Sequence, residues 1–173
     1  MSGHVLGPDE GRTIDLAGVG VRFMIDADRT GSSFSMVEHP IAPRTLGSPI
    51  HTHSREDEYS YVLEGRIGLL IGDDVIEATP GELVFKPRGV PHAFWNATNE
   101  PARLLEIISP AGFERYFAEA ESLFAPGEPD MEAFAALSER YRLRMEFDSV
   151  PRLAAEHGLD MPPEAELAEP PDG

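Results

Sequence analysis

Three histidines in two short segments constrain this chain more than any other feature. His51 and His53 lie two residues apart, and His92 follows a Pro-Arg-Gly turn later in the chain. Side chains two apart in an extended strand point to the same face, so both imidazoles of the first segment face one side. Three imidazoles and a carboxylate suit a divalent ion of intermediate hardness. The sequence therefore predicts a metal site.

Three carboxylates follow the first histidine pair, and each is a candidate for the fourth ligand. They are Glu56, Asp57 and Glu58. We favour Glu58 because it falls where the next strand is expected to start. Four protein ligands on a six-coordinate ion leave two positions for water, O₂ or a chelating substrate.

Short β segments bounded by turn residues fill the region 12–110. Glycine and proline occur 16 times each, and such frequent turn formers favour many short strands. An all-β sandwich or barrel is therefore expected. The predicted strands are 12–16, 19–25, 33–38, 58–63, 66–71, 75–77, 82–86, 92–97 and 102–108.

The flanks of this β region differ from it in composition. Residues 1–11 are expected to form an arm, and 111–160 a helical extension. Within that extension, apolar residues at helical spacing predict helices over 112–124, from an N-cap at Asp130, and over 150–157. The phenylalanines of the first helix are expected to be core packing at one barrel mouth or over the outer sheet. The Pro- and Glu-rich segment 161–173 is expected to be disordered.

The two histidine segments resemble the two motifs of the cupin superfamily. The pattern H-x-H-x₄-E-x₆-G runs from His51 to Gly65, and G-x₅-P-x-G-x₂-H-x₃-N runs from Gly81 to Asn96. One position departs from the pattern, because Thr45 stands where the first motif usually begins with glycine. The resemblance implies an all-β cupin jelly-roll β-barrel with a short C-terminal helical extension. Among cupins, the chain is most similar to small bacterial single-domain proteins such as quercetin 2,3-dioxygenase.

The resemblance also implies the site residues. The metal ligands are His51, His53, Glu58 and His92, and they hold one divalent transition metal ion per chain (Fe, Mn, Ni, Cu, Co or Zn). Glu58 is in addition the expected catalytic base. Strand alternation places further side chains on the inner face as pocket candidates: Phe94, Val62, Ser60, Met36, Phe23 and Ile108. His39, which precedes a proline, is expected to be a structural residue at a strand end.

Three functions are compatible with such a site. The resemblance favours a metal-dependent dioxygenase that acts on an enolizable or hydroxylated aromatic small molecule. The first alternative is an isomerase, cyclase or lyase that uses the metal as a Lewis acid without oxygen. The second alternative is a non-enzymatic module that binds a small ligand. Turnover without oxygen separates the two enzyme classes, and recovery of an unchanged ligand indicates the binding module.

Charge and cysteine content exclude several partners. Lys+Arg 14 against Asp+Glu 31 gives a net charge of -17, which opposes binding to nucleic acid or an anionic membrane. The absence of cysteine excludes disulfides and thiolate metal sites. The N-terminus shows no signal-peptide pattern, so a cytoplasmic location is expected. Exposed strand edges need covering, and we expect a homodimer that involves the N-terminal arm.

Overall fold

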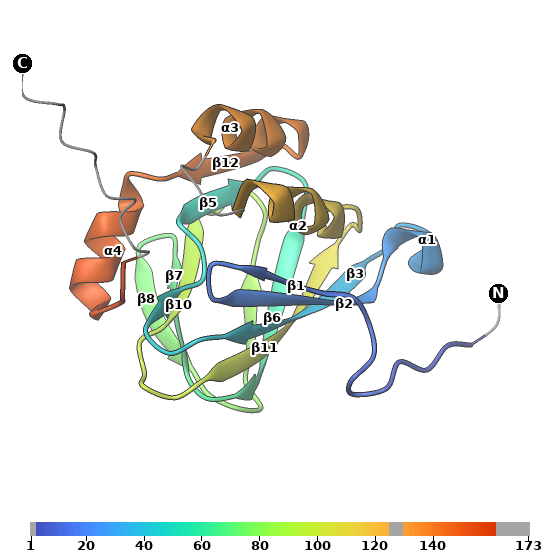
Figure 1. Cartoon of the computed structure of the whole chain (residues 1–173), viewed down its shortest axis with the longest axis horizontal. Helices are drawn as coiled ribbons and strands as arrows, with labels where there is room; N and C mark the ends of the chain where they lie inside the picture. Colours follow the sequence, from blue (N-terminus) through green and yellow to red (C-terminus); the bar gives the residue numbers. More distant parts are fainter. Residues whose placement is uncertain (1–2, 125–129, 162–173) are drawn as a thin grey trace, which may run out of the picture.

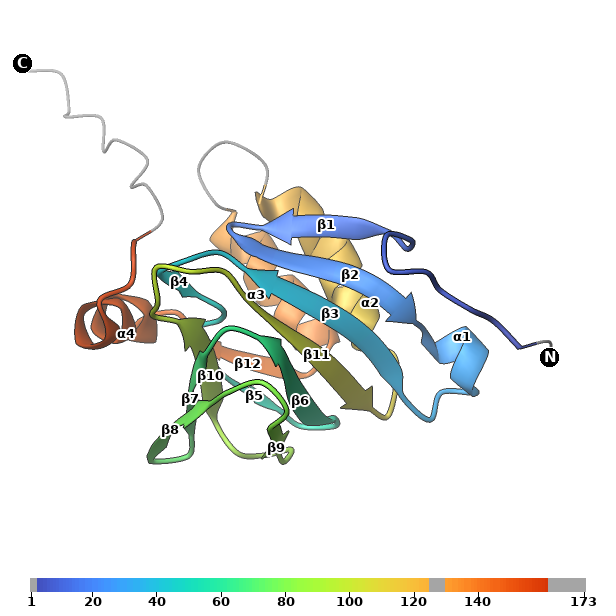
Figure 2. The ribbon, with the colours of Figure 1, turned by 90° about the horizontal axis from the view of Figure 1, so that it is seen from below.

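Two antiparallel sheets face each other across the molecule (Figures 1 and 2). The structure is a computed structural model that describes residues 3–124 and 130–161. The first sheet has the order β1 (Thr13–Leu16), β2 (Val19–Ile25), β3 (Ser35–Ile41), β11 (Ala102–Ser109), β6 (Asp57–Glu64) and β9 (Leu83–Lys86). The second has the order β12 (Leu143–Glu146), β5 (Ile50–His53), β10 (His92–Asn96), β7 (Ile67–Ile71) and β8 (Asp74–Ala78), and β4 (Thr45–Leu46) pairs with β10. The predicted all-β jelly roll is confirmed.

Every predicted strand is present with small shifts at its ends, but the structure adds strands that the sequence did not predict. The most consequential is β12, which lies within the expected helical extension and pairs with β5. It covers the edge of the strand that carries two of the histidines. Its four residues, Leu-Arg-Met-Glu, alternate between apolar and charged side chains, which is a usable signal for a half-buried strand that the helical interpretation of this segment missed.

The helices flank the barrel in two places (Figure 1). Helix α2 (Glu114–Ala120), the 3₁₀ turn Glu121–Phe124 and helix α3 (Met131–Arg140) lie at one end, above β5 and β12. Helix α4 (Ser149–His157) packs on the outside of the second sheet, where His157 stacks on Trp95. The predicted N-cap is confirmed, since the Asp130 side chain accepts a hydrogen bond from Ala133 N. A short helix α1 (Ala27–Thr30), which was not predicted, connects β2 to β3.

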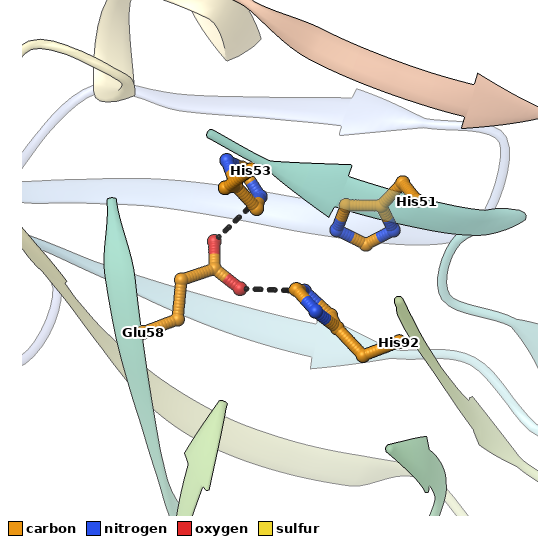
Figure 3. Close-up of side chains that lie close together, drawn as sticks. All are labelled: His51, His53, Glu58 and His92. Atoms are coloured by element: carbon orange, nitrogen blue, oxygen red, sulfur yellow. Dashed lines mark hydrogen bonds and ion pairs between the residues drawn. The ribbon is translucent and has the colours of Figure 1, made fainter. Parts of the chain in front are cut away.

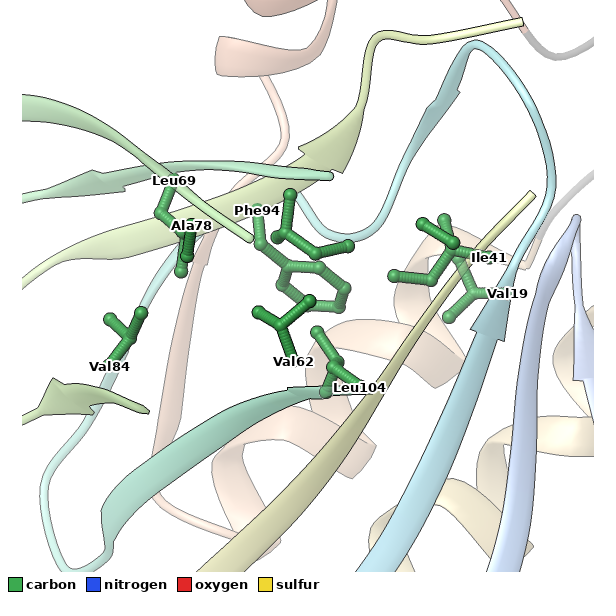
Figure 4. Packing of buried hydrophobic residues seen from close by; sticks show 10 residues of the cluster. Val19, Ile41, Val62, Leu69, Ala78, Val84, Phe94 and Leu104 are labelled. Carbon is green, nitrogen blue, oxygen red and sulfur yellow. The ribbon is translucent and has the colours of Figure 1, made fainter. Parts of the chain in front are cut away.

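The core is divided between the two ends of the barrel. At the end away from the helices, side chains from both sheets pack together (Figure 4): Val19, Ile41, Val62, Ile67, Leu69, Ala78, Val84, Phe94, Ala102 and Leu104. At the other end, α2 packs Phe113 and Tyr116 against inward residues of the first sheet such as Val37 and Ile108. The phenylalanine stripe of the first predicted helix thus closes one mouth of the barrel.

No helix in the described ranges 3–124 and 130–161 is long and apolar enough to cross a membrane. The predicted tail 161–173 lies, apart from Met161, outside the described residues. The expected homodimer stays a prediction. Tyr61, Leu83 and Phe85 are exposed on the outer face of the first sheet, where a second copy would cover them.

Gly47 lets the inner aromatic ring of Phe94 approach the backbone. A Cβ atom at Gly47 would lie 2.2 Å from Phe94 Cε2, and Gly47 N donates to Phe94 O over 2.8 Å. We expect Gly47→Ala to lower the free energy of unfolding by about 1–3 kcal/mol through overpacking. Urea denaturation measures this change. Gly3→Ala is the control because nothing lies within 4 Å of its new Cβ. Equal stability of the two variants would contradict the packing role.

Candidate metal centre

Strands from both sheets bring the four predicted ligands together (Figure 3). His51 on β5 and His92 on β10 are directly paired in the second sheet, and His53 follows on the same face of β5. Glu58 approaches from β6 of the first sheet. One ligand atom from each of the four side chains lies within 4.8 Å of the others, and all four residues are buried.

Backbone carbonyls hold two of the three imidazole rings. Nδ1 of His51 lies 3.0 Å from Pro49 O, and Nδ1 of His92 lies 3.0 Å from Val90 O. A carbonyl only accepts, so Nδ1 carries the proton in both rings and Nε2 keeps its lone pair. Each contact reaches back two residues, to the segment that leads into the strand, so the local backbone sets the tautomer that a metal requires.

A carboxylate takes the corresponding place at the third ring. Nδ1 of His53 lies 3.6 Å from Glu56 Oε2, and Glu56 is buried at 3% exposure. On its other side, Nε2 of His53 lies 3.3 Å from Glu58 Oε1. Neither contact has hydrogen-bond geometry, so both ring nitrogens are buried without a hydrogen-bond partner among the described residues. A buried imidazole between two carboxylates suits a metal ligand with an orienting acid behind it.

The contact between His92 and Glu58 also calls for a cation. Nε2 of His92 lies 3.2 Å from Glu58 Oε2, and burial lowers the pKa of His92. A neutral ring with its proton on Nδ1 presents a lone pair to the carboxylate, and two acceptors repel each other. A positive ion between them removes that repulsion. The donor set therefore fits a divalent metal, which His51, His53, Glu58 and His92 would hold.

The histidines differ in their affinity for protons. Burial holds the pKa of His51 well below its ordinary value, and the neighbouring His92 and His53 act in the same direction. Burial also acts to lower the pKa of His53, but the charges of Glu58 and Glu56 outweigh it and raise the pKa to about 9. One proton on His53 is thus the natural competitor of a metal ion.

Sequence reasoning missed a buried charge cluster beside these ligands. Lys86 Nζ lies 2.8 Å from Glu58 Oε2 and 2.9 Å from Glu106 Oε2. Ser60 donates to the same oxygen of Glu106 over 2.8 Å. Lys86 and Glu106 are 1% and 2% exposed. Strand register explains the cluster, since Glu58 faces Lys86 and Ser60 faces Glu106 on the inner side of the first sheet. Period-2 alternation of 82–86 and 102–108 would have placed both charges inside, which is a usable signal.

Two of the four ligands, His51 and Glu58, border a cavity of about 500 Å³. His51, Glu58, Lys86 and Glu106 lie on its wall together with His39. Most of the remaining wall is apolar, and it includes rings from the helical extension. The aromatic residues of the wall are Phe94 from β10 and, from the helical extension, Phe113, Tyr116, Phe117, Phe124, Phe134 and Phe147. Phe113 packs edge-on against the His53 ring at 4.4 Å, so α2 shields the centre from water.

Only one of the six predicted pocket residues lines this cavity, and it is Phe94. Val62 and Ile108 point inward, but they pack in the hydrophobic core and do not line the cavity. Ser60 holds Glu106 rather than facing open space. The other two predictions need correction. Phe23 packs at the edge of the core under Arg12. Met36 alternates with inward Val37 and so lies on the outer face of β3.

The alternative carboxylates occupy other positions. Asp57 lies on the opposite side of β6 from Glu58, where it pairs with Arg88 at 2.6 Å. Glu56 stands behind His53 rather than beside the other two rings. The choice of Glu58 as the carboxylate of the cluster agrees with the geometry. His39, expected at a strand end, instead lies within β3 and borders the cavity.

Comparison with known proteins finds a match for the segment that carries this cluster. Residues 38–108 match the Cupin domain family, and all four ligands fall within that range. An uncharacterized protein of Methanocaldococcus jannaschii is 30% identical over 66 residues, which are 38% of this chain and 50% of that protein. The chain thus spans about half the length of the curated relative that it matches.

Solved structures of the cupin fold superpose on the barrel. A cupin described as a sugar phosphate isomerase from Silicibacter pomeroyi has a TM-score of 0.55 at 23% identity, covering 61% of this chain and 75% of that one. The nucleoside dehydratase Pac13 from Streptomyces has a TM-score of 0.53 at 13% identity, covering 66% of this chain and 88% of that one. At these identities the likeness concerns the fold.

We expect metal affinity to depend on pH through His53. Below its pKa of about 9, the ring carries a proton that the metal must displace. The association constant should therefore fall about tenfold for each pH unit below 9 and level off above it. Competition with a chelator at pH 7 to 10 measures the constant. A constant that does not change between pH 7 and 9 would rule out His53 as the competing site.

Substitution of the carboxylate behind His53 tests its orienting role. We expect Glu56→Gln to move the bend in the affinity–pH profile to lower pH, since one of the charges that raise the pKa of His53 is lost. At pH 9.5, where the proton no longer competes, affinity should still fall roughly 10–100-fold. Asp57→Asn is the matched control, because Asp57 pairs with Arg88 at the surface. Equal profiles for both variants would refute the role of Glu56.

Proposed function

We propose that this cupin-type barrel is a metal-dependent enzyme that transfers protons on a small-molecule substrate without oxygen, as an isomerase or lyase. One observation carries the proposal. Lys86 Nζ bridges Glu58 Oε2 at 2.8 Å and Glu106 Oε2 at 2.9 Å, on the wall of the cavity that His51 and Glu58 also line. Groups that hold and release protons thus lie beside the metal ligands.

The two carboxylates around Lys86 differ in their hold on a proton. Burial acts to raise the pKa of Glu58, but Lys86 and His53 outweigh it and keep that pKa well below its ordinary value. Burial raises the pKa of Glu106 to about 7, with the charge of Glu58 assisting and Lys86 opposing. One buried lysine neutralises one carboxylate, so the second keeps its proton near neutral pH. Carboxyl groups with separated pKa values are typical of acid–base pairs.

We therefore propose Glu106 as the base, in place of Glu58, which was expected from the sequence resemblance. A carboxylate with a depressed pKa is a poor proton acceptor, whereas Glu106 has the pKa that suits proton transfer near pH 7. When bound, the metal supplies Lewis-acid polarisation of the substrate. Glu58 helps to hold it, Glu106 exchanges the proton, and Lys86 positions both carboxylates. Phe94 and Phe113 exclude water around them.

The names of the similar structures agree with this chemistry. A sugar phosphate isomerase and a nucleoside dehydratase share the fold, and both names describe reactions without an oxidant. Their names support the view that this fold can carry out oxygen-independent reactions. In this chain, the cluster of Lys86, Glu58 and Glu106 favours such a reaction.

A dioxygenase is the second candidate, favoured by the aromatic wall of the cavity. Rings from β10 and α2, among them Phe94, Phe113 and Phe117, border the space next to the metal ligands. Such a wall fits a flat, hydroxylated aromatic molecule, which is the substrate class expected from the sequence resemblance.

The presence of oxygen separates the two candidates. Protein loaded in turn with Fe(II), Mn(II), Ni(II) and Zn(II) is assayed under argon and in air, with neutral sugars, sugar acids and flavonols as substrates. We expect turnover under argon at the same rate as in air, loss on chelation, and recovery on metal addition. Turnover that requires air and consumes oxygen would establish the dioxygenase instead. No turnover by metal-loaded protein would leave a binding module.

Substitution of Glu106 tests the proton-transfer step. We expect Glu106→Gln to lower kcat by about 10²–10⁴-fold while metal content stays unchanged, because Glu106 is not a ligand. The control is Glu77→Gln, which removes an exposed carboxylate paired with Arg66. Wild-type kcat in Glu106→Gln would refute this assignment.

A further inference from the structure

The polar wall of the cavity continues beyond the metal ligands to two side chains that are not ligands. They are His39 on β3 and Glu106 on β11, which are neighbouring strands of the first sheet. His39 pairs with Leu104 in the strand register, and Glu106 pairs with Val37. The two side chains are therefore diagonal neighbours on one face, with backbones about 7–8 Å apart. That spacing suits two neighbouring groups of one small ligand.

Glu106, which lines the cavity, has one carboxyl oxygen without a partner among the described residues. Its Oε2 accepts from both Ser60 and Lys86, whereas Oε1 is buried and has no hydrogen-bond partner among residues 3–124 and 130–161. An unsatisfied buried carboxyl oxygen is costly. Because Lys86 and Ser60 fix the other oxygen, the group cannot turn to satisfy Oε1 without breaking those bonds. A ligand is the natural partner.

His39 presents a lone pair. Its Nδ1 lies 2.9 Å from Gly20 O, so Nδ1 carries the proton and Nε2 is an acceptor. Pro40, which packs against Gly20, has no N–H to offer that carbonyl, which explains why the histidine takes it. Burial lowers the pKa of His39 to about 4, so the ring is neutral. No described residue donates to Nε2.

We propose that Glu106 Oε1 and His39 Nε2 form a hydroxyl-recognition pair, and that the substrate of this cavity is a neutral polyhydroxylated molecule of monosaccharide size. This proposal rests on the proposed function and names its substrate class. Two neighbouring hydroxyl groups satisfy the pair, and the rest of the molecule extends toward His51 and Glu58. A hydroxyl group both donates and accepts, so it suits Glu106 in either protonation state.

The apolar neighbours of the pair fit the same class. The His39 ring lies 5.3 Å from the Phe117 ring and 6.2 Å from the Phe94 ring. Such rings pack against the C–H face of a cyclic polyol while its hydroxyl groups meet the polar wall. The cavity of about 500 Å³ falls in the range of small-molecule sites.

The charges on the wall disfavour an anionic substrate. Among the described residues that line the cavity, Lys86 is the only lysine or arginine, and Glu58 and Glu106 already engage it. A phosphate group would enter beside two carboxyl groups without a free cation to pair with. Phosphate recognition ordinarily relies on arginine or lysine. The cavity therefore selects neutral molecules over their phosphorylated forms.

Calorimetry on the metal-free protein tests this proposal, since a phosphate cannot then bind through the metal. The probes are D-glucose, D-fructose, D-xylose and myo-inositol, against D-glucose 6-phosphate and cyclohexanol. We expect at least one neutral polyol to bind at least tenfold more tightly than either comparison compound. Equal or tighter binding of the phosphate or of cyclohexanol than of every polyol overturns the proposal.

Two variants assign the binding to the pair. His39→Phe keeps an aromatic ring and removes Nε2, and Glu106→Leu keeps a side chain of similar volume and removes Oε1. Each should weaken polyol binding about tenfold, as expected for one lost hydrogen bond, and leave cyclohexanol binding unchanged. His4→Phe, at an exposed position, is the control. Should His39→Phe unfold, Glu106→Leu alone decides, and wild-type affinity in it overturns the assignment.

Failure of this proposal is distinguishable from failure of the proposed function. Polyol binding is measured without metal and without turnover, whereas the proposed function depends on metal-dependent catalysis under argon. Polyol binding without catalysis would leave the recognition pair intact and refute the enzyme. Catalysis on a substrate without neighbouring hydroxyl groups would support the enzyme and refute the recognition pair.

Discussion

Glu58 is the side chain on which the centre depends, because it joins the two sheets electrostatically. Its Oε1 lies 3.3 Å from His53 on the second sheet, and its Oε2 lies 2.8 Å from Lys86 on the first. A buried carboxylate is stable only with compensating charge and hydrogen bonds. Lys86 supplies one positive charge, and a metal or a proton at the histidines supplies another. The Glu58 carboxylate thus lies between the inner faces of the two sheets and is stabilised from both.

Strand pairing places Lys86 of β9 opposite Glu58 of β6, and Glu106 of β11 opposite Ser60, two residues further along β6. Burial of a third charge there forces one carboxyl group toward its neutral form, and Glu106 takes that role. The polar wall of the cavity thereby contains two carboxyl groups with different pKa values, a lowered one at Glu58 and a raised one at Glu106. The helical extension completes the enclosure, since α2 seals one mouth with Phe113 and β12 covers the edge of β5.

Much of the fold and of the ligand cluster follows from the printed sequence, for local reasons. Spacing by two places His51 and His53 on one face, and turn residues mark the ends of most strands. Pocket residues were predicted poorly, because strand alternation tells inside from outside without telling core from cavity. Val62 and Ile108 point inward yet pack in the core. Met36 lies on the outer face because its neighbour Val37 is the residue of β3 that faces inward.

The sequence by itself indicated the all-β barrel through its turn residues and strand alternation, and it indicated the four clustered ligands through the resemblance of its two histidine segments to the cupin motifs. Only the tertiary structure decided which charges meet inside. Lys86, Glu106 and His39 are far apart in the chain, and their contacts depend on the pairing of β9 with β6 and of β11 with β3. Pairing across strands is fixed by the whole sheet and its burial, which no local pattern encodes.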